Sequence, residues 1–114
     1  MSNESQKITI RHYGVSPWEI NVITSILQKK FYTDDEEVER DYDSKYVSII
    51  DIPIPYEFNE EFFNWFEYKE WEKLKGIFKE MKRRRGDGKA IKINLSFAGE
   101  PLIKFVIDAD QGQW

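Results

Sequence analysis

The stretch FFNWFEYKEW, residues 62–71, contains six aromatic side chains in ten consecutive positions. When each residue is placed about 100° further around a helix, the apolar side chains from here to Met81, apart from Trp65 and Tyr68, fall within about half of the circumference. So wide an apolar face needs a sheet to cover it. We therefore predict an amphipathic helix of an α+β domain. Its inward face is formed by Phe62, Phe63, Phe66, Trp71, Leu74, Ile77, Phe78 and Met81.

Capping residues mark both ends of this helix. Asn59 is a suitable N-cap, and the two glutamates that follow it lie where the helix dipole favours negative charge. The apolar pattern continues to about Arg85, and Gly86 suits the left-handed conformation that ends many helices. The sequence thus predicts one continuous helix between these residues.

A strand and a first helix precede this segment. Residues 7–13 (KITIRHY) alternate between apolar and polar side chains, as a strand with one buried face does. Residues 16–19 (SPWE) open the helix, because Ser16 is a suitable N-cap, proline takes the first helical position and Glu19 completes a capping box. An apolar stripe continues this helix to about Phe31.

Three further segments have the composition of strands. Residues 45–55 form a β-branched run that contains Pro53 and Pro55. Because proline cannot donate a ladder hydrogen bond, we expect the far end of this strand at an edge of the sheet or outside it. Residues 90–97 and 102–108 flank the tight turn AGEP, which predicts an antiparallel hairpin. Its inward side chains are Ile91, Ile93, Leu95, Phe97, Ile103, Phe105 and Ile107.

The order of elements is therefore β-α-β-α-β-β. Two helices packed on one face of a four-stranded, mainly antiparallel sheet would bury every apolar stripe, which predicts a two-layer α+β sandwich, ferredoxin-like or related. The length of 114 residues suits a single domain over residues 1–114. Within it, we expect a flexible N-terminus at residues 1–6 and an acidic loop at residues 33–44.

The composition excludes several classes of function. The chain has no Cys, which removes disulfides, thiol chemistry and cysteine zinc sites, and it lacks the apolar run of a signal peptide or a membrane span. His12 is the single histidine, and Asp41 and Asp43 lack the further ligand spacing of a calcium loop. We therefore expect a cytoplasmic protein that is not an enzyme, has no cofactor and binds neither metal nor membrane.

Charge is divided between two segments of opposite sign. Residues 34–43 carry seven acids and one Arg, a net charge of −6, whereas residues 81–92 carry six basic residues and one Asp, a net charge of +5. Patches of one sign speed association with oppositely charged partners. Each patch therefore suggests a different function.

The acidic patch favours binding to a basic protein. Trp65 and Tyr68 are spaced i, i+3 and would project from the predicted helix opposite its core face, where exposed aromatics are typical of binding hot spots. Alternatively, residues 53–58 or the acidic loop cover them. We predict a non-enzymatic protein-binding module, in one version an inhibitor or immunity-type protein, whose partner is a basic protein or a second copy of the chain. Its contacts would be the anchors Trp65 and Tyr68 and the acids Asp34, Asp35, Glu36, Glu37 and Glu39.

The basic patch favours an alternative function, a nucleic-acid-binding domain. An Arg-rich helix end beside a sheet suits the phosphates of an RNA backbone. RNA-binding sheets, however, usually present aromatic side chains for base stacking, whereas the outward positions of residues 91–97 are Lys92, Asn94 and Ser96. The residues of this alternative are Lys82, Arg83, Arg84, Arg85, Lys89 and Lys92.

Overall fold

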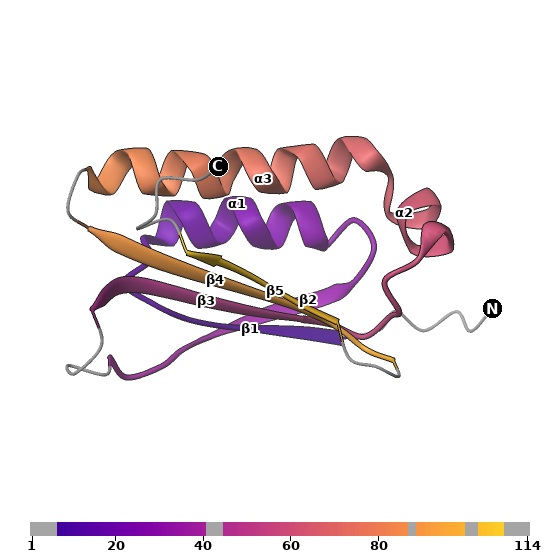
Figure 1. Ribbon diagram of the computed structural model, residues 1–114, viewed down its shortest axis with the longest axis horizontal. Coiled ribbons are helices and arrows are strands. Elements are labelled where there is room, and N and C mark those ends of the chain that lie inside the picture. The colour runs from indigo at the N-terminus through magenta and orange to yellow at the C-terminus, as the bar shows by residue number, and fades with distance from the viewer. Residues whose placement is uncertain (1–6, 41–44, 87–88, 100–102, 109–114) are drawn as a thin grey trace.

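The computed structural model of the protein describes residues 7–40, 45–86 and 89–99 and the backbone of residues 103–108. One five-stranded sheet lies beneath two long helices, which cover the same face of it (Figure 1). A short third helix lies at one end. The elements are β1 (Lys7–Tyr13), α1 (Pro17–Leu27), β2 (Tyr32–Glu37), β3 (Tyr46–Ile54), α2 (Glu60–Phe66), α3 (Tyr68–Arg85), β4 (Ala90–Phe97) and β5 (Ile103–Asp108).

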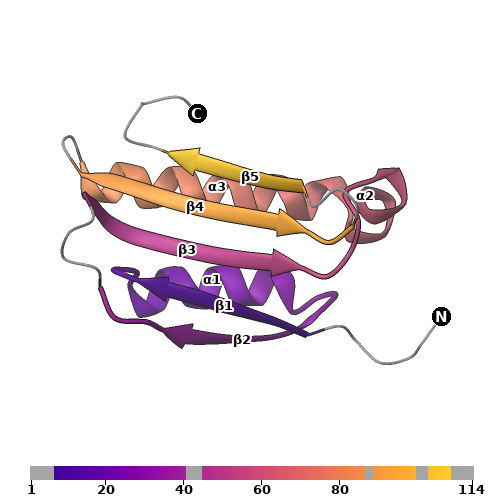
Figure 2. The same ribbon diagram turned by 60° about the horizontal axis from the view of Figure 1, so that its bottom comes forward.

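The sheet is mixed, with the strand order β2-β1-β3-β4-β5 (Figure 2). The pairs β1–β2 and β3–β4 are parallel, and the pairs β1–β3 and β4–β5 are antiparallel. The α+β class is confirmed, but the prediction of a four-stranded, mainly antiparallel sheet is wrong. The physical reason is the placement of the helices, because parallel neighbours need a long crossover and both parallel pairs have helical segments between them in the chain.

The acidic stretch is the largest correction to the sequence prediction. The loop expected at residues 33–44 begins as β2, an edge strand that pairs in parallel with β1. Opposite charges face each other across this pair, with Lys7 Nζ 3.3 Å from Asp34 Oδ2 and Arg11 Nε 3.5 Å from Glu36 Oε1. The acidic segment has low strand propensity, but its ladder hydrogen bonds to β1 hold it as a strand. Charged side chains on this edge strand disfavour pairing with other chains.

The first helix begins as the sequence predicts. Ser16 Oγ accepts a hydrogen bond from the Glu19 amide at 3.2 Å, and Glu19 Oε1 accepts one from the Ser16 amide at 3.0 Å, which confirms the capping box. The helix ends at Leu27 rather than near Phe31. The chain then turns, and Phe31 is buried in the core from outside the helix.

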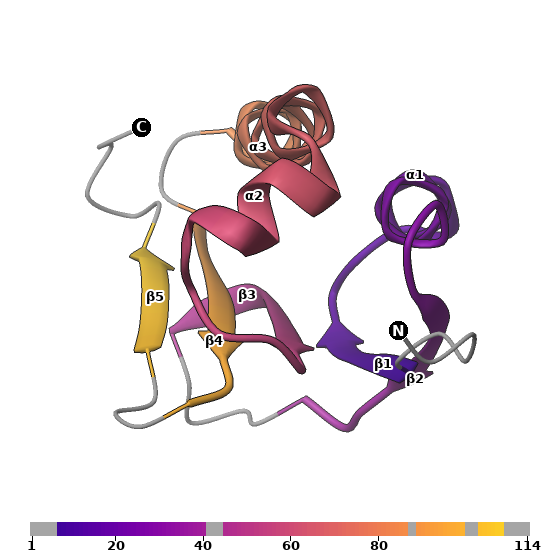
Figure 3. The ribbon, with the colours of Figure 1, turned by 90° about the vertical axis from the view of Figure 1, so that its right-hand side faces the viewer.

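The second predicted helix is interrupted. Asn59 caps α2 as predicted, with its Oδ1 accepting from the Phe62 amide at 2.9 Å, but Glu67 has φ 73° and separates α2 from α3. Figure 3 shows α2 at a steep angle to α3, across the end of the sheet. One straight helix would point Trp65 away from the core face, whereas the break turns α2 so that Trp65 packs against the core. At the far end Gly86 has the expected positive φ, 80°, but an extended ψ of −174°.

The core agrees closely with the predicted inward faces. Phe62, Phe66 and most of the inward α3 residues are buried, while Phe63 and Trp71 are partly buried against them. The inward residues of β4 are buried, and its antiparallel pairing with β5 is confirmed. The side chains of β5 and the turn residues 100–102 lie outside the described residues, as do residues 1–6 and 41–44. The end of β3 that contains Pro53 pairs with β4 on one side only, since the pairing with β1 covers residues 49–51.

Candidate protein-binding surface

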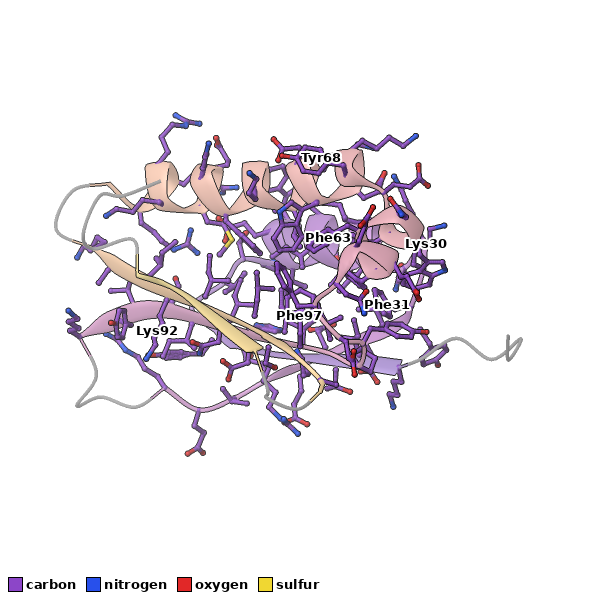
Figure 4. All side chains as sticks on the ribbon, turned by 45° about the vertical axis from the view of Figure 1, so that its right-hand side comes forward. Lys30, Phe31, Phe63, Tyr68, Lys92 and Phe97 are labelled. Atoms are coloured by element: carbon purple, nitrogen blue, oxygen red, sulfur yellow. The ribbon has the colours of Figure 1, made fainter. Side chains whose placement is uncertain are left out.

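The two predicted anchors, Trp65 and Tyr68, do not share one helix face. Trp65 is in the last turn of α2 and is partly buried, whereas Tyr68 begins α3 and is 66% exposed. Figure 4 shows Tyr68 on the outer side of α3, away from Phe63 and Phe97, which lie between helices and sheet. Tyr56 packs against Trp65 with ring centroids 5.1 Å apart, so the segment 53–58 covers part of the indole. The alternative in which residues 53–58 cover the aromatics therefore holds for Trp65, whereas Tyr68 is exposed.

A cluster of aromatic rings fills the end of the molecule beneath α2. Neighbouring ring centroids are 5.0 to 6.5 Å apart, and many pairs meet edge to face. Such geometry adds to the stabilisation that comes from burial of the rings alone. Tyr68 lies outside this cluster. Its members are Phe31, Tyr56, Phe58, Phe62, Phe63, Trp65, Phe66, Trp71 and Phe97.

A surface pocket of about 340 Å³ opens beside this cluster. The rings of Tyr56, Phe62 and Trp65 line it together with Asn59, Glu57 and Glu61. The lining is therefore aromatic and acidic, and it is formed by α2 and the segment that leads into it. Sequence reasoning identified Trp65 but not this pocket. The pocket forms only when the segment before Asn59 lies against the side chains of α2.

The acids of the β2 edge are partly neutralised by β1. Asp34 and Glu36 pair with Lys7 and Arg11, and a hydrogen bond from Thr9 lowers the pKa of Asp34. Asp35 Oδ2 lies 2.9 Å from Nε2 of His12, which is buried.

Glu37 and Glu39, by contrast, are exposed and form no ion pair within the described residues. The predicted acidic contacts thus lie together at one sheet edge, and its outer end carries unneutralised charge.

The basic end of α3 is largely used within the fold. Arg85, with 15% of its side chain exposed, donates to both carboxylate oxygens of Glu19 at 2.8 Å. It also donates to Ser48 Oγ at 2.7 Å and to the Gly14 carbonyl at 2.8 Å. Burial raises the pKa of Glu19, but hydrogen bonds from Arg85 and the Ser16 backbone and the charge of Arg85 outweigh it, and the pKa falls from 4.5 to about 2.

The other residues of the nucleic-acid alternative also have partners within the chain. Lys82 donates to the carbonyl oxygens of Gly86 and Lys89, and Arg83 donates to Glu80. Arg84 lies over the ring of Trp18 with its guanidinium 5.0 Å from the centroid. Lys92 Nζ lies 5.5 Å from the centroid of Tyr46, and Lys89 is exposed. The residues of the basic patch are therefore split between the helix end and the sheet.

Two buried carboxylates were not predicted as ion-pair sites. Glu19 was identified only as a helix cap, and its partner Arg85 only as a phosphate ligand. Glu70 is buried on α3 and accepts from Nζ of Lys29, in the turn after α1, at 2.7 and 2.8 Å and from Lys73 at 3.1 Å. The hydrogen bond from Lys29 lowers the pKa of Glu70. No local pattern reveals such pairs, because Glu19 and Arg85 are 66 residues apart in the chain.

The described residues contain no group of three histidine, aspartate or glutamate side chains placed to hold a metal ion. The considered ligands Asp41 and Asp43 lie outside those residues. In the same part of the chain, every helix is too short or too polar to cross a bilayer. Comparison of the whole chain with protein-family models, curated protein sequences and solved structures gave no match.

Proposed function

We propose that this protein is a non-enzymatic binding module for a basic protein, which it contacts through the acidic edge strand β2 and the neighbouring aromatic surface. One version is an inhibitor-type or immunity-type protein that covers the positive cleft of its target. Electrostatic complementarity of this kind raises the rate of association and selects the partner by charge.

The placement of acids on β2 carries this proposal. An edge strand presents its side chains and one row of backbone groups to an incoming chain. The acids at Asp34 to Glu37 follow one another along this edge, and Glu39 lies just beyond it. Phe31, immediately before β2, packs against Trp65 with ring centroids 5.2 Å apart. The start of β2 therefore adjoins the aromatic surface, while Glu37 and Glu39 lie at and just beyond the other end of the strand.

Affinity capture from a nuclease-treated lysate of the source cells tests the proposal. We expect one basic protein to stay bound, and its association rate at low salt to fall severalfold with Glu37→Gln/Glu39→Gln, because exposed charges mainly affect encounter. The control Glu72→Gln/Glu80→Gln removes the same charge from α3 and should bind like the wild type. An association rate indifferent to the β2 charges would contradict the proposal.

The alternative, nucleic-acid binding through the basic end of α3, has less support because Arg85 and Lys82 already donate to groups within the chain. The same capture experiment discriminates between the two. Loss of all bound material on nuclease treatment, together with loss of binding by Arg83→Ala/Arg84→Ala and a steep salt dependence, would favour the alternative.

A further inference from the structure

The pocket beside α2 differs from the other acidic parts of the molecule in having aromatic walls. Three rings, those of Tyr56, Phe62 and Trp65, line a volume of about 340 Å³, and Glu57 and Glu61 contribute carboxylates. Volumes of this order lie at the lower end of the range for pockets that hold small ligands or single side chains. The rings are fixed by the surrounding cluster, with Phe62 stacked on Phe66 at a centroid distance of 5.5 Å.

The carboxylates around this pocket have no cationic partner among the described residues. Glu19, Glu70, Glu72 and Glu80 each pair with a lysine or arginine. No such pair forms at Glu57, Glu60 or Glu61 within the described ranges, although all three are exposed. The helix dipole favours acids in the first turn of α2, which accounts for Glu60 and Glu61 but not for Glu57, which precedes the cap.

Aromatic faces attract cations, and one already lies beside this site. Lys30 Nζ is 5.6 Å from the centroid of Trp65, and it is 3.9 Å from Glu67 Oε2. Lys30 is not among the residues that line the pocket. The fold thus places an ammonium group against this indole, while the pocket itself offers further rings and two free carboxylates to a second cation.

We propose that this pocket binds the cationic side chain of a lysine or arginine from the partner protein. The identity of the ligand rests on the proposed function, since the pocket adjoins the start of β2 through Phe31, which packs against both Tyr56 and Trp65. An anion would be repelled by the carboxylates, and a neutral apolar group would leave them without a partner. The alkyl part of a lysine or arginine packs on the rings while its charge reaches Glu57 and Glu61.

A nuclear magnetic resonance titration of the ¹⁵N-labelled protein tests this site directly. The probe is Nα-acetyl-lysine methylamide, and the comparator is the norleucine analogue, which has the same alkyl chain without the ammonium group. We expect the lysine compound to shift the indole N–H signal of Trp65, assigned with Trp65→Phe, and the norleucine compound to leave it in place. Equal shifts with both compounds would overturn the proposal.

Charge-removing variants complete the test. Glu57→Gln/Glu61→Gln should weaken lysine binding by about fivefold or more, whereas Glu72→Gln/Glu80→Gln should not change it. Unchanged amide signals elsewhere show that each variant is folded. Wild-type affinity in the pocket variant would overturn the proposal. The two proposals can also fail separately. If the lysine compound binds to the pocket but the capture experiment yields no basic protein, the proposed function is contradicted and the cation site is still supported.

Discussion

The Glu19 site and the pocket beside α2, at opposite ends of the sheet, treat charge in opposite ways. At the end where α1 begins and α3 finishes, Glu19 is buried and both its oxygens accept from Arg85. At the other end, beneath α2, aromatic rings form the interior, and Glu57, Glu60 and Glu61 are exposed without a described cation. Charge that is matched inside the chain stabilises the fold, whereas charge left unmatched at a surface pocket is available to a partner.

Among the changes at the two sites, removal of Arg85 should lower the free energy of unfolding most. Arg85→Ala leaves the buried Glu19 carboxylate with the more distant Arg84, whose Nε lies 3.8 Å from Glu19 Oε2, and we expect a loss of about 3 kcal/mol in the free energy of unfolding. Urea unfolding followed by circular dichroism measures it. Arg83→Ala is the matched control, since this neighbouring side chain is exposed and its one ion pair within the described residues is with Glu80 on the same helix. A loss no larger than that of the control would show that the buried pair does not stabilise this end.

The double variant Glu19→Gln/Arg85→Ala separates the cost of an unpaired charge from the loss of arginine packing. It loses the same packing as Arg85→Ala but leaves no buried charge, so we expect it to be more stable than Arg85→Ala alone. Equal stability of the two variants would mean that packing of the arginine, and not the unpaired charge of Glu19, carries the effect.

Acid should weaken the same end selectively. The pKa of Glu19 is about 2 in the folded chain and near 4.5 when unfolded, so its stabilisation is complete above pH 4.5 and is lost as the pH falls toward 2. The loss is on the order of 3 kcal/mol. Unfolding measured from pH 5 to pH 2 should show a flatter dependence for Glu19→Gln than for the wild type. Identical pH profiles would contradict the lowered pKa.

Removal of charge at the aromatic end should have the smallest effect. Glu57→Gln/Glu61→Gln takes away exposed carboxylates that have no described partner, so we expect the free energy of unfolding to change by less than about 0.5 kcal/mol. Thermal unfolding beside the wild type measures it. A large destabilisation would show that these acids serve the fold, and the contrast between the two ends would disappear.

The parts of the fold that the sequence predicted depend on neighbours within a few positions. Ser16 and Glu19 close a capping box across three residues, and Asn59 caps α2 in the same way. The inward faces of β4 and α3 follow from the repeat of apolar residues at strand and helix spacing. Of the candidate site, the acidic composition of the 34–39 segment and the choice of Trp65 also came from local composition.

Only the tertiary structure decided the remaining features, because each depends on a partner distant in sequence. β2 is a strand because β1 supplies its ladder and the cations Lys7 and Arg11. The helix is broken at Glu67, and the break brings Phe63 of α2 against Trp71 of α3 with ring centroids 5.5 Å apart, although nothing in the local sequence marks Glu67 as a turn. Arg85 became a structural residue rather than a free cation once folding brought it against the carboxylate of Glu19, since a buried charge must find its opposite.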